Sequence, residues 1–289
     1  MKNSLIKRTI ISSLRFSTLF LALLFTFSPG LAKAGLFDRD SPLIEKKLNG
    51  EIDWERGFIR ASGTSAATPG EDELSGNLAV KRLAVMRAAK IDAMRNILDV
   101  IKTIRVDSDT NVEMYMISSD FIRSKLHETI RKAQVIDKKY ISNDGLELTI
   151  ELPILGSFIE TMIPDTGGLA ADIMGIEQES GIIIDASGLG AKPALSPRIL
   201  DDSGRELYGA SYIKRDYFLS KGLVAYRTSL DDAINSARVS SNPIIIKAIR
   251  SAGPENSDLI ISKADAKKLK IGSSSHSSFE KGNVIIVLD

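Results

Sequence analysis

The longest regular pattern in this sequence predicts an amphipathic helix over residues 77–106. Its apolar residues recur at steps of three and four, which places them on one face of a helix. They are Ala79, Leu83, Met86, Ala89, Ala93, Ile97, Ile101 and Ile104. A helix of this length would extend about 40 Å, enough to span a small domain. Because its alanines carry little bulk, we expect another element to approach the helix closely there.

Residues 1–34 have the pattern of an export signal. Basic residues precede an apolar run over 16–27, which at about a dozen residues is too short to span a bilayer. Ala32 and Ala34 flank Lys33 as a small-x-small site, so we expect cleavage between Ala34 and Gly35; an uncleaved amino-terminal anchor is the alternative. No cysteine follows for lipid attachment. We therefore expect a periplasmic, non-lipidated protein with no transmembrane span in its mature chain.

Composition excludes several classes of function. The chain has 38 basic and 37 acidic residues, and the leader holds five of the basic ones and no acid, which leaves a formal charge of −4. This balance argues against a nucleic-acid binder. The absence of cysteine removes disulfides, thiolate ligands and thiol nucleophiles. His127 and His276 are the two histidines and lack metal-ligand spacing. We expect no catalytic residue, no metal and no cofactor.

Beyond the leader, the patterns predict an α+β fold in two parts. The first part, about residues 48–163, is expected to contain a strand over 51–61, the long helix, a second helix over 119–133 that begins at Ser119, and a hairpin of 135–141 with 146–152. Residues 62–76 and 164–180 are predicted as a loop and a linker, because they are rich in small and turn-forming residues. The second part, residues 178–289, is predicted as a mixed α/β domain.

One motif in the first part carries a family resemblance. Trp54, Gly57, Ile59, Ala61 and Gly63 form W-x-x-G-x-I-x-A-x-G, followed by the alanine-spaced helix, a second helix and an Asp-Gly hairpin. Over residues 50–155 this arrangement resembles the LPP-twenty lipoprotein family and the N-terminal domain of flagellar assembly protein T. The resemblance implies an envelope protein of an adhesion, flagellar or surface-assembly context, with no enzymatic residue to carry over. The missing acylated cysteine favours the soluble, flagellar-type relatives.

The second part shows no nucleotide-binding signature. Its first strand, 181–186, runs into a glycine-containing turn, but Pro193 and Pro197 follow where a phosphate-binding loop would need a helix. Residues 273–278 are expected as a serine-rich loop and 283–288 as a central strand. Four polar residues near predicted strand ends are candidate ligand contacts, although each could equally be a surface ion-pair member: Asp185, Arg198, Tyr226 and Lys247.

Three functions remain open from the sequence. The first is a non-enzymatic periplasmic or envelope-associated protein that scaffolds or assembles a surface structure such as the flagellar basal body, with envelope or basal-body proteins as partners. The second is a periplasmic binding module for a small ligand or cell-wall fragment between the two parts, where such sites often lie. The third is a hydrolase, for which the sequence marks no set of residues. The long helix also leaves a homo-oligomer open.

Overall fold

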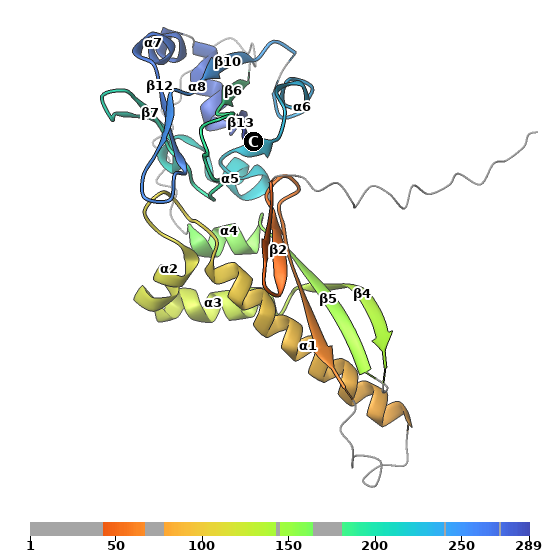
Figure 1. Ribbon diagram of the computed structural model, residues 1–289. Helices are drawn as coiled ribbons and strands as arrows, with labels where there is room; N and C mark the ends of the chain where they lie inside the picture. Colours follow the sequence, from red (N-terminus) through yellow and green to blue (C-terminus); the bar gives the residue numbers. More distant parts are fainter. Residues whose placement is uncertain (1–42, 67–77, 143–144, 164–180, 240, 272) are drawn as a thin grey trace, which may run out of the picture. The chain divides into compact units, whose positions relative to one another are not determined.

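The computed structural model describes residues 43–66, 78–142, 145–163, 181–239, 241–271 and 273–289 (Figure 1). The export signal with its cleavage site, the linker 164–180 and most of the predicted loop 62–76 lie outside these residues. The fold is α+β, because an antiparallel sheet with a long helix is followed by parallel and mixed sheets with short helices. The predicted fold class is confirmed.

The first sheet is antiparallel and has the strand order β1-β2-β3-β5-β4. Its strands are β1 (Ile44–Lys47), β2 (Gly50–Asp53), β3 (Phe58–Ser65), β4 (Gln134–Ile141) and β5 (Gly145–Pro153). On β5, Leu146, Leu148, Ile150 and Leu152 are buried, while the residues between them are partly exposed. One face of the sheet is therefore covered, which explains why apolar and polar residues alternate along β5.

Helix α1 (Leu78–Lys102) covers that face along β3 and β5 (Figure 1). The closest approach is at Gly63 of β3, where an added Cβ would collide with backbone atoms of Ala89 and Ala93. A glycine on the strand and two alanines on the helix thus let the two backbones come together. The expectation that small side chains mark a close contact is confirmed.

The predicted apolar face of this helix is wrong at its N-terminal end. Ala79 and Leu83 are exposed, and burial along the helix begins at Val85. The reason is geometric: β3 ends at Ser65, only two residues beyond its contact with the helix at Gly63, so the first turns of α1 extend past the strand.

Three short helices complete the first half: α2 (Val112–Ser118), α3 (Asp120–Ile130) and α4 (Ser157–Met162). Asn111 caps α2 by accepting the backbone N–H of Met114, and Ser119 caps α3 by accepting that of Ile122. The predicted cap at Ser119 is confirmed. Helix α2 was not predicted, because its two buried residues, Val112 and Met116, are too few to give a clear period.

The second half contains two four-stranded sheets. The strands β10-β6-β13-β9 form a parallel sheet, and β11-β12-β7-β8 form a mixed one. In chain order they are β6 (Ile182–Asp185), β7 (Ile199–Asp201), β8 (Glu206–Tyr208), β9 (Ala225–Arg227), β10 (Ile244–Lys247), β11 (Arg250–Ala252), β12 (Asp258–Ile261) and β13 (Val284–Val287). The interior position of β13, between β6 and β9, confirms the central strand predicted over 283–288.

Short helices connect these strands: η1 (Ala210–Tyr212), α5 (Arg215–Lys221), α6 (Leu230–Ile234), α7 (Lys263–Ile271) and α8 (Ser273–Glu280). The loop predicted over 273–278 is wrong, since α8 occupies it. Tertiary packing explains the helix: Phe279 is buried against Tyr208, with ring centroids 4.6 Å apart in a stacked arrangement. This contact outweighs the weak helix preference of serine.

The single strand predicted over 51–61 is also wrong, because a turn divides it into β2 and β3. The Asp53 carboxylate accepts the backbone N–H of Arg56 at 2.9 Å, and the Asp53 carbonyl accepts that of Gly57 at 2.8 Å. Gly57 then takes a φ of 73°, which glycine adopts without strain. An aspartate whose side chain accepts the backbone N–H three residues later, followed by a glycine, is typical of a tight turn.

One hydrophobic core includes residues from both halves of the chain, and the described residues belong to a single compact unit. Trp54 of the first half and Tyr226 of the second meet edge to face, with centroids 6.0 Å apart. The division into domains at 48–163 and 178–289 remains a prediction. Within the described ranges, no helix is both long and apolar enough to cross a bilayer.

The Gly63 contact gives a stability prediction. Gly63→Ala should lower the free energy of unfolding by about 1–3 kcal/mol, because the new methyl group meets helix backbone that cannot rotate away. Urea unfolding followed by circular dichroism measures the change. Ser65→Ala on the same strand is the control, with an expected change within about 0.5 kcal/mol. Equal midpoints for the two variants would contradict the tight contact.

Candidate functional site

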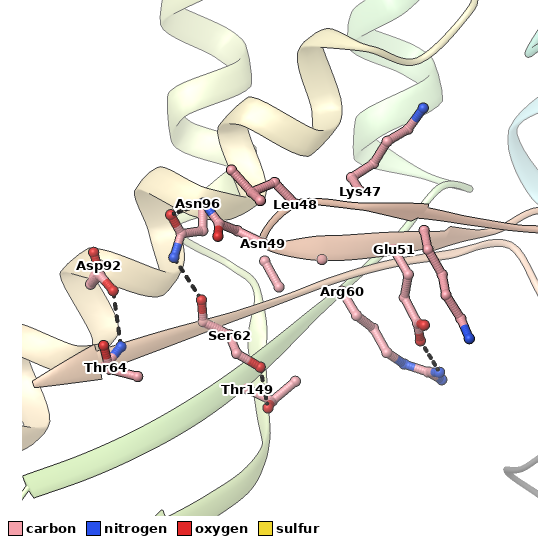
Figure 2. A pocket seen from close by; sticks show the side chains of 13 residues that line it. Lys47, Leu48, Asn49, Glu51, Arg60, Ser62, Thr64, Asp92, Asn96 and Thr149 are labelled. Atoms are coloured by element: carbon pink, nitrogen blue, oxygen red, sulfur yellow. Dashed lines mark hydrogen bonds and ion pairs between the residues drawn. The ribbon is translucent and has the colours of Figure 1, made fainter.

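A cleft of about 720 Å³ opens beside β3, at the turn of the β1–β2 hairpin (Figure 2). The hairpin contributes Leu48 and Asn49, β3 contributes Arg60 and Ser62, and α1 and β5 close the other sides. Its volume falls in the range of about 300–1,000 Å³ that is common for small-molecule sites. The cleft is therefore the first place to look for binding chemistry.

The cleft exists because the hairpin is shorter than the strand it pairs with. Pairing between β2 and β3 ends at Gly50 opposite Ala61, whereas β3 continues to Ser65. Two α1 side chains form hydrogen bonds with the backbone groups of β3 that the hairpin does not reach. Asn96 Nδ2 donates to the Ser62 carbonyl at 2.7 Å, and Asp92 Oδ2 accepts the Thr64 N–H at 2.9 Å (Figure 2). These side chains replace the missing strand as hydrogen-bond partners.

Charge in the cleft is locally paired. Arg60 donates to Glu151 at 2.7 Å and to Glu51 at 3.2 Å. Burial alone would lower the pKa of Arg60, but its hydrogen bonds and charge contacts with Glu151 and Glu51 outweigh burial and raise the pKa above its ordinary value. The guanidinium is thus held as a cation between two carboxylates.

Two further pairs of polar side chains in the cleft bond to each other. Asn49 Nδ2 donates to Asn96 Oδ1 at 3.2 Å, and the hydroxyls of Ser62 and Thr149 are 2.8 Å apart. Throughout the described ranges, no group of three or more His, Cys, Asp and Glu side chains is arranged to hold a metal ion. The cleft offers shape and satisfied polar groups rather than an activated nucleophile with its base.

The structure brings Arg198, one of the four candidate contacts, to the junction of the two halves. Its Nε and Nη2 donate to Asp258 Oδ2 at 2.9 and 2.6 Å, and Nη2 also contacts Ser108 Oγ and Asp109 Oδ2 at 2.8 and 3.1 Å. The hydrogen bond that Arg198 donates to Asp258 is the main cause that raises the pKa of Arg198. A cleft of about 250 Å³ lies beside it, bounded in part by Asp107.

Tyr226 reaches the same junction, but its hydroxyl is occupied. It donates to the carbonyl of Ala194 at 2.8 Å and accepts the N–H of the same residue at 2.9 Å. Burial is the main reason that the pKa of Tyr226 is raised well above its ordinary value. The residue fastens the segment after β6 to the core rather than contacting solvent.

Asp185 and Lys247 lie together elsewhere, at the carboxyl edge of the parallel sheet, where they are register partners on β6 and β10. Asp185 Oδ1 accepts the N–H and the hydroxyl of Ser187 at 3.0 and 2.6 Å and so closes the turn after β6. Lys247 is exposed. Tyr226 on β9, Asp185 on β6 and Lys247 on β10 thus belong to three strands of the parallel sheet, whereas Arg198 precedes β7 of the mixed sheet. Their role as ligand contacts remains a prediction.

One buried arginine, Arg105, and one half-buried arginine, Arg238, were not predicted. Arg105 stands between Ile104 and Val106, and Arg238 directly precedes Val239. Burial lowers the pKa of both, that of Arg238 to about 10. For Arg105, an arginine between two apolar residues was the available signal, because such a residue must carry its hydrogen-bond partners into the core. Arg238 stands in a polar segment that gave no such signal.

Comparison with known proteins adds one similarity. Residues 181–289 match the family model of the second domain of Treponema pallidum Tp0624. No curated protein matches this chain. The matched range contains both sheets of the second half and ends with β13, so the similarity concerns the half that follows the linker.

The Arg198 network gives the second prediction. Asp258 is buried, so Asp258→Ala would leave the Ser108 hydroxyl and the Arg198 guanidinium without their shared acceptor. We expect a loss of about 2–3 kcal/mol in the free energy of unfolding. Asp109→Ala, which removes an exposed partner of the same Nη2, should change it by less than about 1 kcal/mol. Similar losses in the two variants, measured by urea unfolding, would refute the assignment of Asp258 as the main partner.

Proposed function

We propose that this protein is a non-enzymatic, envelope-associated component that scaffolds or assembles a surface structure such as the flagellar basal body. The observation that supports the proposal most is a set of exposed apolar side chains on α2 and α3. Met114, Ile117 and Phe121 are 52%, 75% and 65% exposed. They lie in the part of the chain that carries the resemblance to LPP-twenty and flagellar assembly proteins.

The exposure follows from how the two helices pack. Val112 and Met116 take the buried side of α2, while Ile122 and Leu126 take that of α3. Ser119 separates the helices with an extended backbone, at φ −146° and ψ 113°. The large side chains on either side of this break have no place in the core. Burying each one against a partner would contribute about 1.5–3 kcal/mol.

A binding role for a small ligand or cell-wall fragment is the second candidate, and the cleft beside β3 favours it. The cleft at the junction of the halves is about 250 Å³, whereas that beside β3 is about 720 Å³. A ligand of the size of a disaccharide peptide fits the second volume better. Thermal-shift screening against peptidoglycan fragments tests this candidate, and Asn96→Ala should reduce any shift that arises in the cleft.

The assembly proposal makes a prediction about Ile117 and Phe121. The double variant Ile117→Ser, Phe121→Ser should fold with an unfolding midpoint close to that of the wild type, since both side chains are mostly in solvent. It should lose at least about tenfold in affinity for its envelope partner, which corresponds to about 1.4 kcal/mol. Crosslinking in cells followed by identification of the captured proteins provides the measurement.

A matched control is Ile249→Ser, which removes another half-exposed isoleucine outside α2 and α3. Recovery of basal-body or secretion-ring components by the wild type and the control, and not by the double variant, supports the proposal. The proposal would be contradicted if deletion of the gene left motility and the envelope appendages unchanged. It would also be contradicted if the double variant captured the same partner proteins as the wild type.

A further inference from the structure

The charges that line the cleft beside β3 restrict the kind of ligand it can take. Arg60 lies between two carboxylates, at 2.7 and 3.2 Å. Both lysines of the lining also have partners: Lys47 forms an ion pair with Glu45 at 3.0 Å, and Lys46 is not free either. Moving an ion out of water costs free energy that only an unpaired opposite charge offsets. The lining therefore favours an uncharged ligand.

Two side-chain oxygens of the lining are left open as hydrogen-bond acceptors. Asn96 donates through Nδ2 to the Ser62 carbonyl, which can only accept, so its Oδ1 faces Asn49 and receives the Asn49 Nδ2. This orientation leaves Asn49 Oδ1 as an acceptor. Asp92 Oδ2 accepts the Thr64 N–H, and its Oδ1 has no donor among the described residues. A ligand that carries hydroxyl groups can donate to both oxygens.

Hydroxyl groups of the same lining supply donors. The Ser62 and Thr149 hydroxyls are 2.8 Å apart, so one proton lies between the two oxygens and the other is left to donate. Thr64 is exposed, and within the described part of the chain its hydroxyl has no partner. The cleft thus presents donors and acceptors together, and Asp92 is the only charged group among them.

An apolar side chain completes the lining. Leu48, at the turn of the β1–β2 hairpin, lines the cleft and is 97% exposed. Figure 2 shows it beside Asn49. A sugar ring has a face of C–H groups and a rim of hydroxyls, so an apolar side chain next to hydrogen-bonding groups matches both parts. Covering a leucine that is so exposed adds a hydrophobic contribution to binding.

We propose that this cleft binds an uncharged sugar, either as a short oligosaccharide or as part of a glycan polymer. A sugar hydroxyl donates and accepts at once, which suits the open oxygens of Asn49 and Asp92 and the hydroxyls of Thr64 and Thr149. The volume of about 720 Å³ admits a short oligosaccharide. The inference rests on the second candidate function, ligand binding in this cleft, and is independent of the surface on α2 and α3.

Two uncharged disaccharides, N,N′-diacetylchitobiose and maltose, are the probes, each titrated into the purified protein by calorimetry. We expect saturable binding of at least one of them, with a Kd of about 1 mM or lower. Because no ion pair forms with the ligand, a roughly tenfold rise in sodium chloride should change this Kd by less than about twofold. A Kd that rises steeply with salt would contradict an uncharged ligand.

Asp92→Asn tests the contact with the sugar. The amide oxygen still accepts the Thr64 N–H, while an NH₂ group replaces the open carboxylate oxygen. We expect the affinity to fall by about tenfold or more, because a charge-assisted hydrogen bond is lost. Asp99→Asn makes the same charge change on α1 outside the cleft and should stay within about twofold of the wild type. Thr64→Val, which removes one hydroxyl and keeps the backbone N–H, should also weaken binding and serves if Asp92→Asn lowers the unfolding midpoint.

Co-sedimentation with purified peptidoglycan sacculi identifies the source of the sugar. Pelleting that Asp92→Asn weakens and that the disaccharide displaces assigns it to a glycan polymer, whereas disaccharide binding without pelleting assigns it to a soluble oligosaccharide. Failure of both disaccharides to bind, or equal weakening by Asp92→Asn and Asp99→Asn, would overturn the proposal. If a complete peptidoglycan fragment then still binds and Asn96→Ala weakens it, the second candidate function stands and the sugar assignment alone is wrong.

Discussion

The packing of the first half depends on how closely α1 can approach β3. At Gly63 the strand has no side chain, and the helix offers only the methyl groups of Ala89 and Ala93. Larger residues at this point would hold the helix away from the sheet, and the buried isoleucines farther along it would lose contact with β5. Interior packing is dense enough that a shift of one methyl group is felt.

The same approach decides the chemistry of the cleft beside β3. Because the helix lies so near the strand, Asp92 and Asn96 can reach the backbone of Thr64 and Ser62, which the short hairpin leaves unpaired. Without those side chains, this part of β3 would present open hydrogen-bonding groups to any extended peptide. Steric fit at one glycine thus sets both the core and the polar lining of the cavity.

Polar contacts fill the junction between the two halves, where the sequence had suggested a ligand. Arg105 donates through Nε to the Pro193 carbonyl at 2.8 Å, its Nη2 contacts Glu45, and its guanidinium lies 6.0 Å from the ring centre of Trp54. A buried cation is tolerated only when partners surround it. These partners come from three separate stretches of chain, so the charge helps to order them.

Much of the fold was predictable because local patterns agree with the final packing. The start of α3 follows from the capping preference of Ser119, and the interior position of β13 follows from its unbroken apolar run. The turn after Asp53 was not predicted, because it depends on the aspartate side chain accepting the backbone N–H of Arg56. Helix α8 was not predicted either, because it depends on the contact between Phe279 and Tyr208, which are far apart in the sequence. Site residues were harder still, since Arg198 and Asp258 meet only through the parallel pairing of β7 with β12.

Two of the exposed apolar regions on the first half, β4 and the pair α2 and α3, differ in how they are protected. The outer strand β4 exposes Ile136 and Tyr140, yet it carries Lys138 and Lys139 and an irregular register near Val135. Charges and bulges of this kind discourage edge-to-edge pairing. Near Met114, Ile117 and Phe121, the acids Glu113 and Asp120 stand at helix starts where they stabilise the helix itself, and Arg123 forms an ion pair with Asp120. An apolar surface kept without such protection is one that a partner is expected to cover.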